Sequence, residues 1–83
     1  MQIKQLRSFL AVADTGSVTA TAEQIHMTQS GISRQIATLE DELGFPLFDR
    51  VRGRLILNRR GIAFRRHVRK SVDSIDHLPR AAR

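Results

Sequence analysis

Two predicted helices near the middle of the chain are joined by only three or four residues. Small and apolar residues favour a short helix from Val18 to about Ile25, and a second helix begins at Gln29. Ser17 and Thr28 are good N-caps for these two helices. A connection this short, followed by small polar residues in the first turn of the second helix, is typical of a helix-turn-helix unit. The sequence therefore predicts a mainly α-helical fold that contains this unit.

The helix that begins at Gln29 has one apolar side and one polar side. Its apolar residues recur at helical spacing and form a narrow stripe of Ile32, Ile36, Leu39 and Leu43. Arg34 points almost directly away from this stripe, and Gly44 is expected to end the helix. We therefore expect the polar side of this helix to face the solvent.

The remaining segments predict two further helices and a small hairpin. An apolar stripe near the N-terminus indicates a first helix that ends at Gly16. Two short apolar runs at residues 47–50 and 55–57 flank a glycine-containing turn and predict a β-hairpin. Asn58 is a good N-cap for a last helix over residues 59–78. A chain of 83 residues has room for one small domain.

The charge of the chain is strongly one-sided. Residues 1–49 carry three basic and six acidic side chains, whereas residues 50–83 carry eleven basic and two acidic ones, and the whole chain has a net charge of +6. Such an excess indicates a polyanionic partner, nucleic acid first and an anionic membrane surface second. No apolar run approaches the ~18 residues that span a membrane, so we expect no membrane span. With nucleic acid as the preferred partner, we expect a cytoplasmic location and no membrane partner.

Several polar residues of the third predicted helix have the chemistry to recognise bases. Gln29 offers a donor and an acceptor to an adenine edge, and the fork of Arg34 matches guanine O6 and N7. Ser30 and Ser33 are short enough to let the helix lie deep in the major groove. The alternative is that these are only solvated surface residues. Their spacing on one polar face favours a role in DNA binding.

Arginines in and near the predicted hairpin form a second candidate site. A turn that carries Arg52 and Arg54 resembles the wing of a winged helix-turn-helix, which lies over the DNA backbone or enters a narrow minor groove. Arg50, Arg59 and Arg60 are close to this turn in sequence and can reach phosphates. Phosphate contacts of this kind add affinity without sequence information. The alternative is a solvated surface turn.

The last predicted helix has an apolar seam of its own. The seam consists of Phe64, Val68, Ser71, Ile75 and Leu78, with Val72 beside it. This heptad spacing predicts that two copies of the chain pair through the helix. The alternative is that the seam packs on its own domain.

The chain as a whole resembles the N-terminal DNA-binding domain of LysR-type transcriptional regulators, a bacterial family. The residues that carry the resemblance lie in order along the chain at 6–13, 16–18, 22–30, 32–36, 39–44 and 47–50. Two departures are visible: Ser30 stands where many members have proline, and Asn58-Arg59-Arg60-Gly61 replaces a Thr-Pro-Ala-Gly-like run. The second departure keeps a capping side chain and adds two charges.

The resemblance implies a winged helix-turn-helix over residues 1–58 and a linker and dimerisation helix over residues 59–83. The residues expected to contact double-stranded DNA, from their chemistry and the resemblance together, are Thr28, Gln29, Ser30, Ser33, Arg34, Thr38, Arg50, Arg52 and Arg54. The residues expected to form a homodimer on a partly palindromic operator are Phe64, Val68, Val72, Ile75 and Leu78. A full-length protein can form higher oligomers.

Family members also carry a larger C-terminal domain that binds a small-molecule effector. The 83 residues do not include one, so we expect either an excised segment or a naturally short relative. No cofactor is expected. The chain has no Cys, its three histidines match no metal-ligand spacing, and no catalytic motif is present, so we expect no enzyme activity. Two alternatives are a nonspecific nucleoid-type or RNA-binding protein and a dimerisation module whose basic surface is incidental.

Overall fold

The computed structural model describes residues 1–77 and has four helices and one two-stranded sheet. The elements are α1 Ile3–Thr15, α2 Val18–Ile25, α3 Gln29–Leu43, β1 Phe48–Val51, β2 Arg54–Leu57 and α4 Arg59–Asp76. This order confirms the predicted mainly α-helical fold with a small hairpin before the last helix. The predicted helix caps are present as well. The side chains of Ser17, Thr28 and Asn58 each accept an amide N–H at the start of a helix, and left-handed glycines follow α1 and α3.

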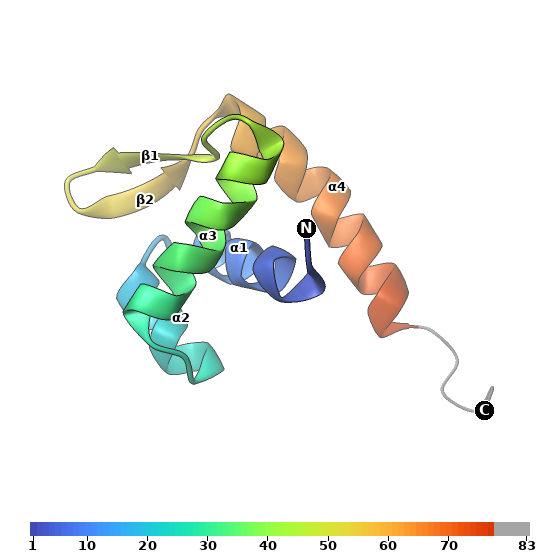
Figure 1. The fold of residues 1–83 in the computed structure, drawn as a ribbon, viewed down its shortest axis with the longest axis horizontal. Coiled ribbons are helices and arrows are strands. Elements are labelled where there is room, and N and C mark those ends of the chain that lie inside the picture. The colour runs from blue at the N-terminus through green and yellow to red at the C-terminus, as the bar shows by residue number, and fades with distance from the viewer. Residues whose placement is uncertain (78–83) are drawn as a thin grey trace.

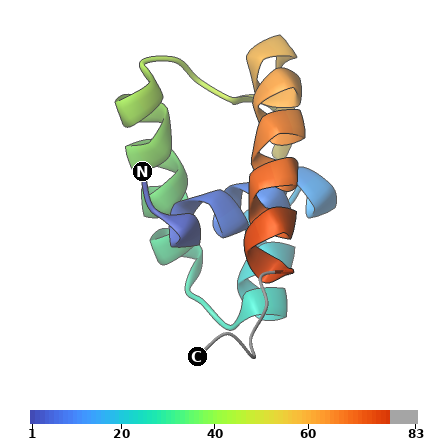
Figure 2. The same ribbon diagram turned by 90° about the vertical axis from the view of Figure 1, so that its right-hand side faces the viewer.

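Helix α1 crosses the middle of the molecule, with α3 on one side and α4 on the other (Figures 1 and 2). Its Phe9 is fully buried, and the Phe9 ring lies 5.6 Å from the ring of Phe48 and 5.3 Å from that of Phe64. Leu39 of α3 and Leu47 of the following loop complete the centre of this cluster. One aromatic residue of α1 thus joins α3, the hairpin and α4 in a single core.

A second apolar cluster holds the helix-turn-helix together. It joins α1, α2 and α3 through Val12, Ala22, Ile32 and Ile36. His26 adopts the left-handed conformation with a φ of 57°, and the amide of Met27 donates to the carbonyl of Ala22 at 3.0 Å. The chain therefore turns within three residues, between Ile25 and Gln29, as the sequence predicts.

The hairpin β1–β2 projects from the helical body on the side away from α4 (Figure 1). Its strands pair antiparallel, with Phe48 opposite Leu57 and Val51 opposite Arg54. The two residues of the turn, Arg52 and Gly53, have φ angles of 51° and 77°. Positive φ at both central positions is the mark of a type I′ turn, whose twist matches that of the strands.

The hairpin is also tied to the helices by its backbone. The amide of Leu55 in β2 donates to the carbonyl of Gly16, in the turn between α1 and α2, at 3.1 Å. The amide of Asn58 donates to the carbonyl of Leu47 at 3.0 Å, which closes the base of the hairpin. A two-stranded sheet is marginal by itself, and these contacts supply the support that it needs.

Helix α4 packs on α1 with the seam that the sequence predicts to join two copies. Val68 and Val72 are 4% exposed, and Phe64 packs against the same core cluster. These three residues are therefore core residues of their own chain, as the alternative interpretation of the seam held. Ile75 is 47% exposed beyond the end of this core. Leu78 lies outside the described residues.

Polar side chains inside the described part of the chain have partners. The hydroxyl of Ser8, which is buried in α1, donates to the side-chain oxygen of Gln35 in α3. The hydroxyls of Thr15 and Thr21 lie 2.8 Å apart between α1 and α2. Within residues 1–77, no buried side-chain nitrogen or oxygen lacks a hydrogen-bond partner. In the same residues no helix combines the length and the apolar character needed to cross a bilayer.

Candidate nucleic-acid interface

The side of α3 that faces away from the core is polar and exposed. Ile32, Ile36 and Leu39 are buried against α1 and α2. On the other side the following predicted residues are all exposed: Gln29, Ser30, Ser33, Arg34 and Thr38. The structure therefore brings the predicted base-facing residues together on one helical face.

Arg34 is the one cation on this face. Arg34 is exposed, and no ion pair or hydrogen bond joins its guanidinium to another residue within 1–77, so its five N–H donors remain available to a ligand. The residues around it are short: Ser30 lies one turn before it on α3, Ser33 directly before it, and Ala37 one turn after it. Short neighbours leave space for a flat surface to approach the helix closely. This arrangement suits bidentate contact between Arg34 and an exposed base edge.

Thr28 caps the N-terminus of α3, and its hydroxyl hydrogen can still be donated in a hydrogen bond. The hydroxyl oxygen of Thr28 accepts the amide N–H of Gly31 at 3.0 Å. The hydroxyl hydrogen of Thr28 can still be donated, and the hydroxyl of Ser30 lies 3.4 Å away. The first amide N–H groups of a helix carry partial positive charge, which favours a phosphate nearby. Thr28 thus both starts the helix and lies at a position suited to a backbone contact.

The wing and α3 border a groove of about 270 Å³. Its walls are formed by Ser33, Ile36, Ala37 and Glu40 of α3 and by Phe48, Arg50 and Leu55 of the hairpin, with Val18 of α2. Because Arg50 lies two residues after Phe48 on β1, both side chains lie on the same face of the sheet, and both line this groove beside α3. Arg50 is therefore placed beside the exposed polar face of α3, at a different position from the tip of the wing.

Arg52 and Arg54 have different surroundings in the wing. Arg52 is one of the two residues of the exposed turn. Arg54 begins β2, and its guanidinium lies against Gly16: a Cβ on that glycine would be 3.2 Å from Nη2. Arg54 therefore extends over the turn between α1 and α2 and does not share the tip with Arg52. The sequence grouped these two arginines in one turn, and the register of the hairpin separates them.

Two arginines at the start of α4 also differ. Arg59 is exposed in the first turn. The guanidinium carbon of Arg60 lies 4.7 Å from the centre of the Phe45 ring, in a cation–π contact. Arg60 thus helps to hold the loop after α3, and Arg59 is the freer of the two for a phosphate.

Two contacts that sequence reasoning missed tie the hairpin to the helices, one to α3 and one to the turn between α1 and α2. The carboxylate of Glu40 accepts the amide N–H of Leu47 at 2.6 Å, and Gly16 accepts the amide of Leu55. The first contact spans seven residues, and the second joins segments that are distant in sequence. No local pattern marks them, because an acid near the end of a helix most often faces solvent.

The remaining acids and histidines of the described residues form no cluster of metal ligands, and one acid lies beside the N-terminal ammonium. Glu42 pairs with the N-terminal ammonium of Met1 at 2.5 Å. Within residues 1–77, no three His, Asp or Glu side chains lie close enough together to hold a metal ion.

The sequence profile described as "Bacterial regulatory helix-turn-helix protein, lysR family" matches residues 3–62. The chain belongs to the lysR family. Among the relatives in this family, the uncharacterised regulator YwqM of Bacillus subtilis is 39% identical over 72 residues, which are 87% of this chain and 25% of that protein. The regulator IlvR of Caulobacter vibrioides is 39% identical over 83 residues, which are 100% of this chain and 28% of that protein. The chain thus spans about a quarter of the length of these curated relatives.

Solved structures of lysR-family regulators have the same fold. The DNA-binding domain of CbnR, solved in complex with DNA, has a TM-score of 0.88 and 36% identity, and the match covers 100% of both chains. The DNA-binding domain of BenM, solved with its benA site 1 DNA, has a TM-score of 0.89 and 32% identity over 94% of this chain and 91% of that one. The fold of this chain is therefore the winged helix-turn-helix of the family. The related proteins are transcriptional regulators, which is a non-enzymatic role.

Proposed function

We propose that this chain binds double-stranded DNA in a sequence-dependent way, as the DNA-reading part of a lysR-family transcriptional regulator. The observation that carries the proposal is the exposed face of α3, where Arg34 and Gln29 lie among short side chains and Arg34 has no ion pair to any residue of 1–77. Related domains of 32% and 36% identity with this fold have been solved on DNA. The proposal places this chain where bacterial DNA lies, in the cytoplasm.

Helix α3 supplies the sequence dependence. An α-helix fits the major groove, where Arg recognises guanine and Gln recognises adenine by paired hydrogen bonds. The geometry favours Arg34, Gln29, Ser30 and Ser33 as base-facing residues, because α3 exposes all of them on one side. Thr28 and Thr38 lie toward the edges of this face and suit contacts to the flanking phosphates.

The wing supplies affinity that does not depend on sequence. Arg50 lies beside α3 and Arg52 at the tip, so the two can meet the backbone at separate points. Arg54 extends toward the start of α2, so a DNA phosphate that Arg54 contacts would lie near that helix. Each phosphate that a cation neutralises releases counterions, which makes the affinity salt-dependent.

Two copies of the chain join through α4 in this proposal, and they bind a partly palindromic site. Support comes from the exposed Ile75 at the far end of the helix, where a seam continues past the core of its own chain. In this proposal, Phe64, Val68 and Val72 do not contact the second copy. They act on the interface indirectly, because they pack α4 onto the core of its own chain. In a longer protein, a further domain would bind a small-molecule effector and could add higher oligomers.

The test is a selection of bound sites from random duplexes, followed by titrations at several salt concentrations. We expect a recovered motif with two related halves, and a preference for it that persists as salt rises. A nonspecific nucleoid-type protein would recover no motif and would lose all duplexes alike, with log affinity falling by about 0.9 per neutralised phosphate against log salt. A pure dimerisation module would hardly bind DNA. Either of these two results would overturn the proposal.

A further inference from the structure

Two ion pairs join α1 to α4 along one edge of their contact. Arg7 of α1 donates to both carboxylate oxygens of Asp76 of α4, at 2.6 and 3.3 Å. Arg69 of α4 donates to both carboxylate oxygens of Asp14 of α1, at 3.0 and 3.3 Å. The hydrogen bond to Asp76, and then the charge of that carboxylate, raise the pKa of Arg7 above its ordinary value. Both pairs are roughly half exposed.

The order of the charges on the two helices is complementary. Each helix carries an arginine followed seven residues later by an aspartate, Arg7 and Asp14 on α1 and Arg69 and Asp76 on α4. Seven residues are about two helical turns, so the two charges of each helix lie on the same side. The two ion pairs connect the helices in opposite order, because the first charge of each helix meets the second charge of the other. Each arginine therefore contacts the aspartate of the other helix, and the two ion pairs hold α4 on α1 at two separate points.

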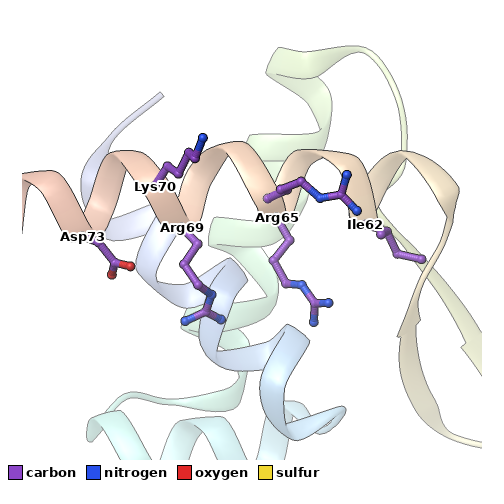
Figure 3. Close-up of a pocket in the computed structure, with 6 residues that line it drawn as sticks. Ile62, Arg65, Arg69, Lys70 and Asp73 are labelled. Carbon is purple, nitrogen blue, oxygen red and sulfur yellow. The ribbon is translucent and has the colours of Figure 1, made fainter.

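The Arg7–Asp76 pair acts where the apolar contact of α4 has ended. Val72 is the last buried residue of α4, and the described residues after it, 73–77, are exposed. Arg69 extends from α4 toward α1, whereas Lys70 points to another side of the helix (Figure 3). One pair thus lies beside the core and the other beyond it, where a charge contact can fix the direction of the C-terminal turns of α4.

We infer that Arg7, Asp14, Arg69 and Asp76 are positioning residues, which fix the direction of α4 relative to α3 and so set the separation of the two DNA half-sites that a dimer prefers. This inference rests on the proposed function, in which two copies join through α4. No residue of the set belongs to the expected base-contacting or phosphate-contacting residues. Their effect on binding would pass through the geometry of the dimer.

The length of α4 turns a small change of direction into a large displacement. The helix has 18 residues and extends ~27 Å at 1.5 Å per residue. A tilt of about 10° moves its far end by about 5 Å, which exceeds the ~3.4 Å between neighbouring base pairs. A weak contact at that end can therefore bear on half-site separation even when it adds little to the stability of the fold.

The test compares the whole chain with the variants Arg7→Glu and Asp76→Arg and with the double variant that exchanges the two charges. Lys4→Glu is the matched control, because Lys4 is an exposed cation of α1 with no ion pair in the described residues. Affinity is measured for duplexes whose two half-sites are separated by the preferred distance, or by one or two base pairs more or fewer. A duplex with a single half-site measures the reading of bases alone.

We expect each single variant to lower the preference for the best spacing by about two- to fivefold, the range that one exposed ion pair can contribute. The charge-exchanged double variant should recover the wild-type preference, and Lys4→Glu should keep it. Single half-site affinity should change equally in Lys4→Glu and Arg7→Glu, since both alter the net charge alike. An unchanged spacing preference in the two single variants, with dimers still present in sedimentation, would overturn the inference and leave the proposed function standing.

A direct measurement of helix direction gives a second test. The sequence has no cysteine, so Glu23→Cys in α2 and Ser74→Cys in α4 can carry spin labels without further changes. Labelled chains diluted with unlabelled ones report the distance within one protomer by pulsed electron resonance. Arg7→Glu should broaden the distance distribution, and the charge-exchanged variant should narrow it again. Identical distributions in all variants would overturn the inference, whereas a wild-type chain that stays monomeric on DNA would count against the proposed dimer.

Discussion

Gly61 lies directly against the backbone carbonyl of Leu47 at the point where α4 begins. A Cβ on Gly61 would be 2.1 Å from the carbonyl oxygen of Leu47 and 2.8 Å from Cδ2 of Leu57. The nearest obstacle is backbone, which cannot rotate away as a side chain does. Helix α4 can approach the base of the wing only because this position has no side chain.

Gly61→Ala should lower the free energy of unfolding by about 1–3 kcal/mol, the usual range for an overpacked core. The direction is informative, because alanine is by itself the better helix former by about 1 kcal/mol. Thermal or urea unfolding measures the change. Ala63→Gly, at an exposed position in the same helix, is the control and should lose about 1 kcal/mol through helix propensity alone. A more stable Gly61→Ala protein would contradict the close approach.

Arg34→Ala should reduce discrimination between DNA sites by about 1–3 kcal/mol on the preferred sequence. The reason is the loss of a paired hydrogen bond to one base edge, which a random duplex does not offer in the right place. Competition titrations with the selected motif and with random duplex measure the difference. Arg66→Ala removes an exposed arginine from α4 and serves as the control. Equal weakening on both duplexes by Arg34→Ala would show that Arg34 contacts only the backbone.

Arg52→Asn should weaken binding to all sequences alike and lower the salt slope of log affinity by about 1. Asparagine tolerates the positive φ of this position better than most residues, so the turn should keep its shape. Arg52→Lys keeps the charge and should keep the slope. If the slope is the same for Asn and Lys, the tip of the wing makes no phosphate contact.

Ile75→Asp should give folded monomers that bind the two-half-site duplex weakly. Ile75 is 47% exposed beyond the core, so a charge there disturbs a partner surface more than the fold. Val68→Asp should instead unfold the chain, because Val68 is 4% exposed and a lone buried carboxylate has no partner. Sedimentation and thermal unfolding distinguish the two results, with Ser74→Asp as the control of equal charge. Dimers that persist in Ile75→Asp would place the interface elsewhere.

The elements of the fold were predictable because their signals are local. Ser17, Thr28 and Asn58 have side chains that accept the first helical amides, and Gly16 and Gly44 allow the left-handed ends. The exposed polar face of α3 was predictable for a similar reason. The apolar stripe of α3 fixes which side is buried, and the polar residues must then lie on the other side.

The partner of an apolar face was not predictable from its spacing. Val68 and Val72 fit a seam between two copies as well as they fit the surface of α1, because both surfaces select the same residues. The ion pairs of Arg7 and Arg69 were hidden as well, since their carboxylates are 69 and 55 residues away in sequence. A helical wheel places Arg69 among solvated charges, and only the packing of α4 brings it to Asp14.

The wing is held at two points before any duplex arrives, by the amide of Leu55 on Gly16 and by the carboxylate of Glu40 on the amide of Leu47. Glu40 belongs to the same helix as Arg34, so these hydrogen bonds hold the hairpin beside the helix that we propose enters the major groove. In the proposed complex with DNA, the hairpin and α3 would therefore lose little conformational entropy on binding. More of the free energy of their contacts with DNA would then appear as affinity.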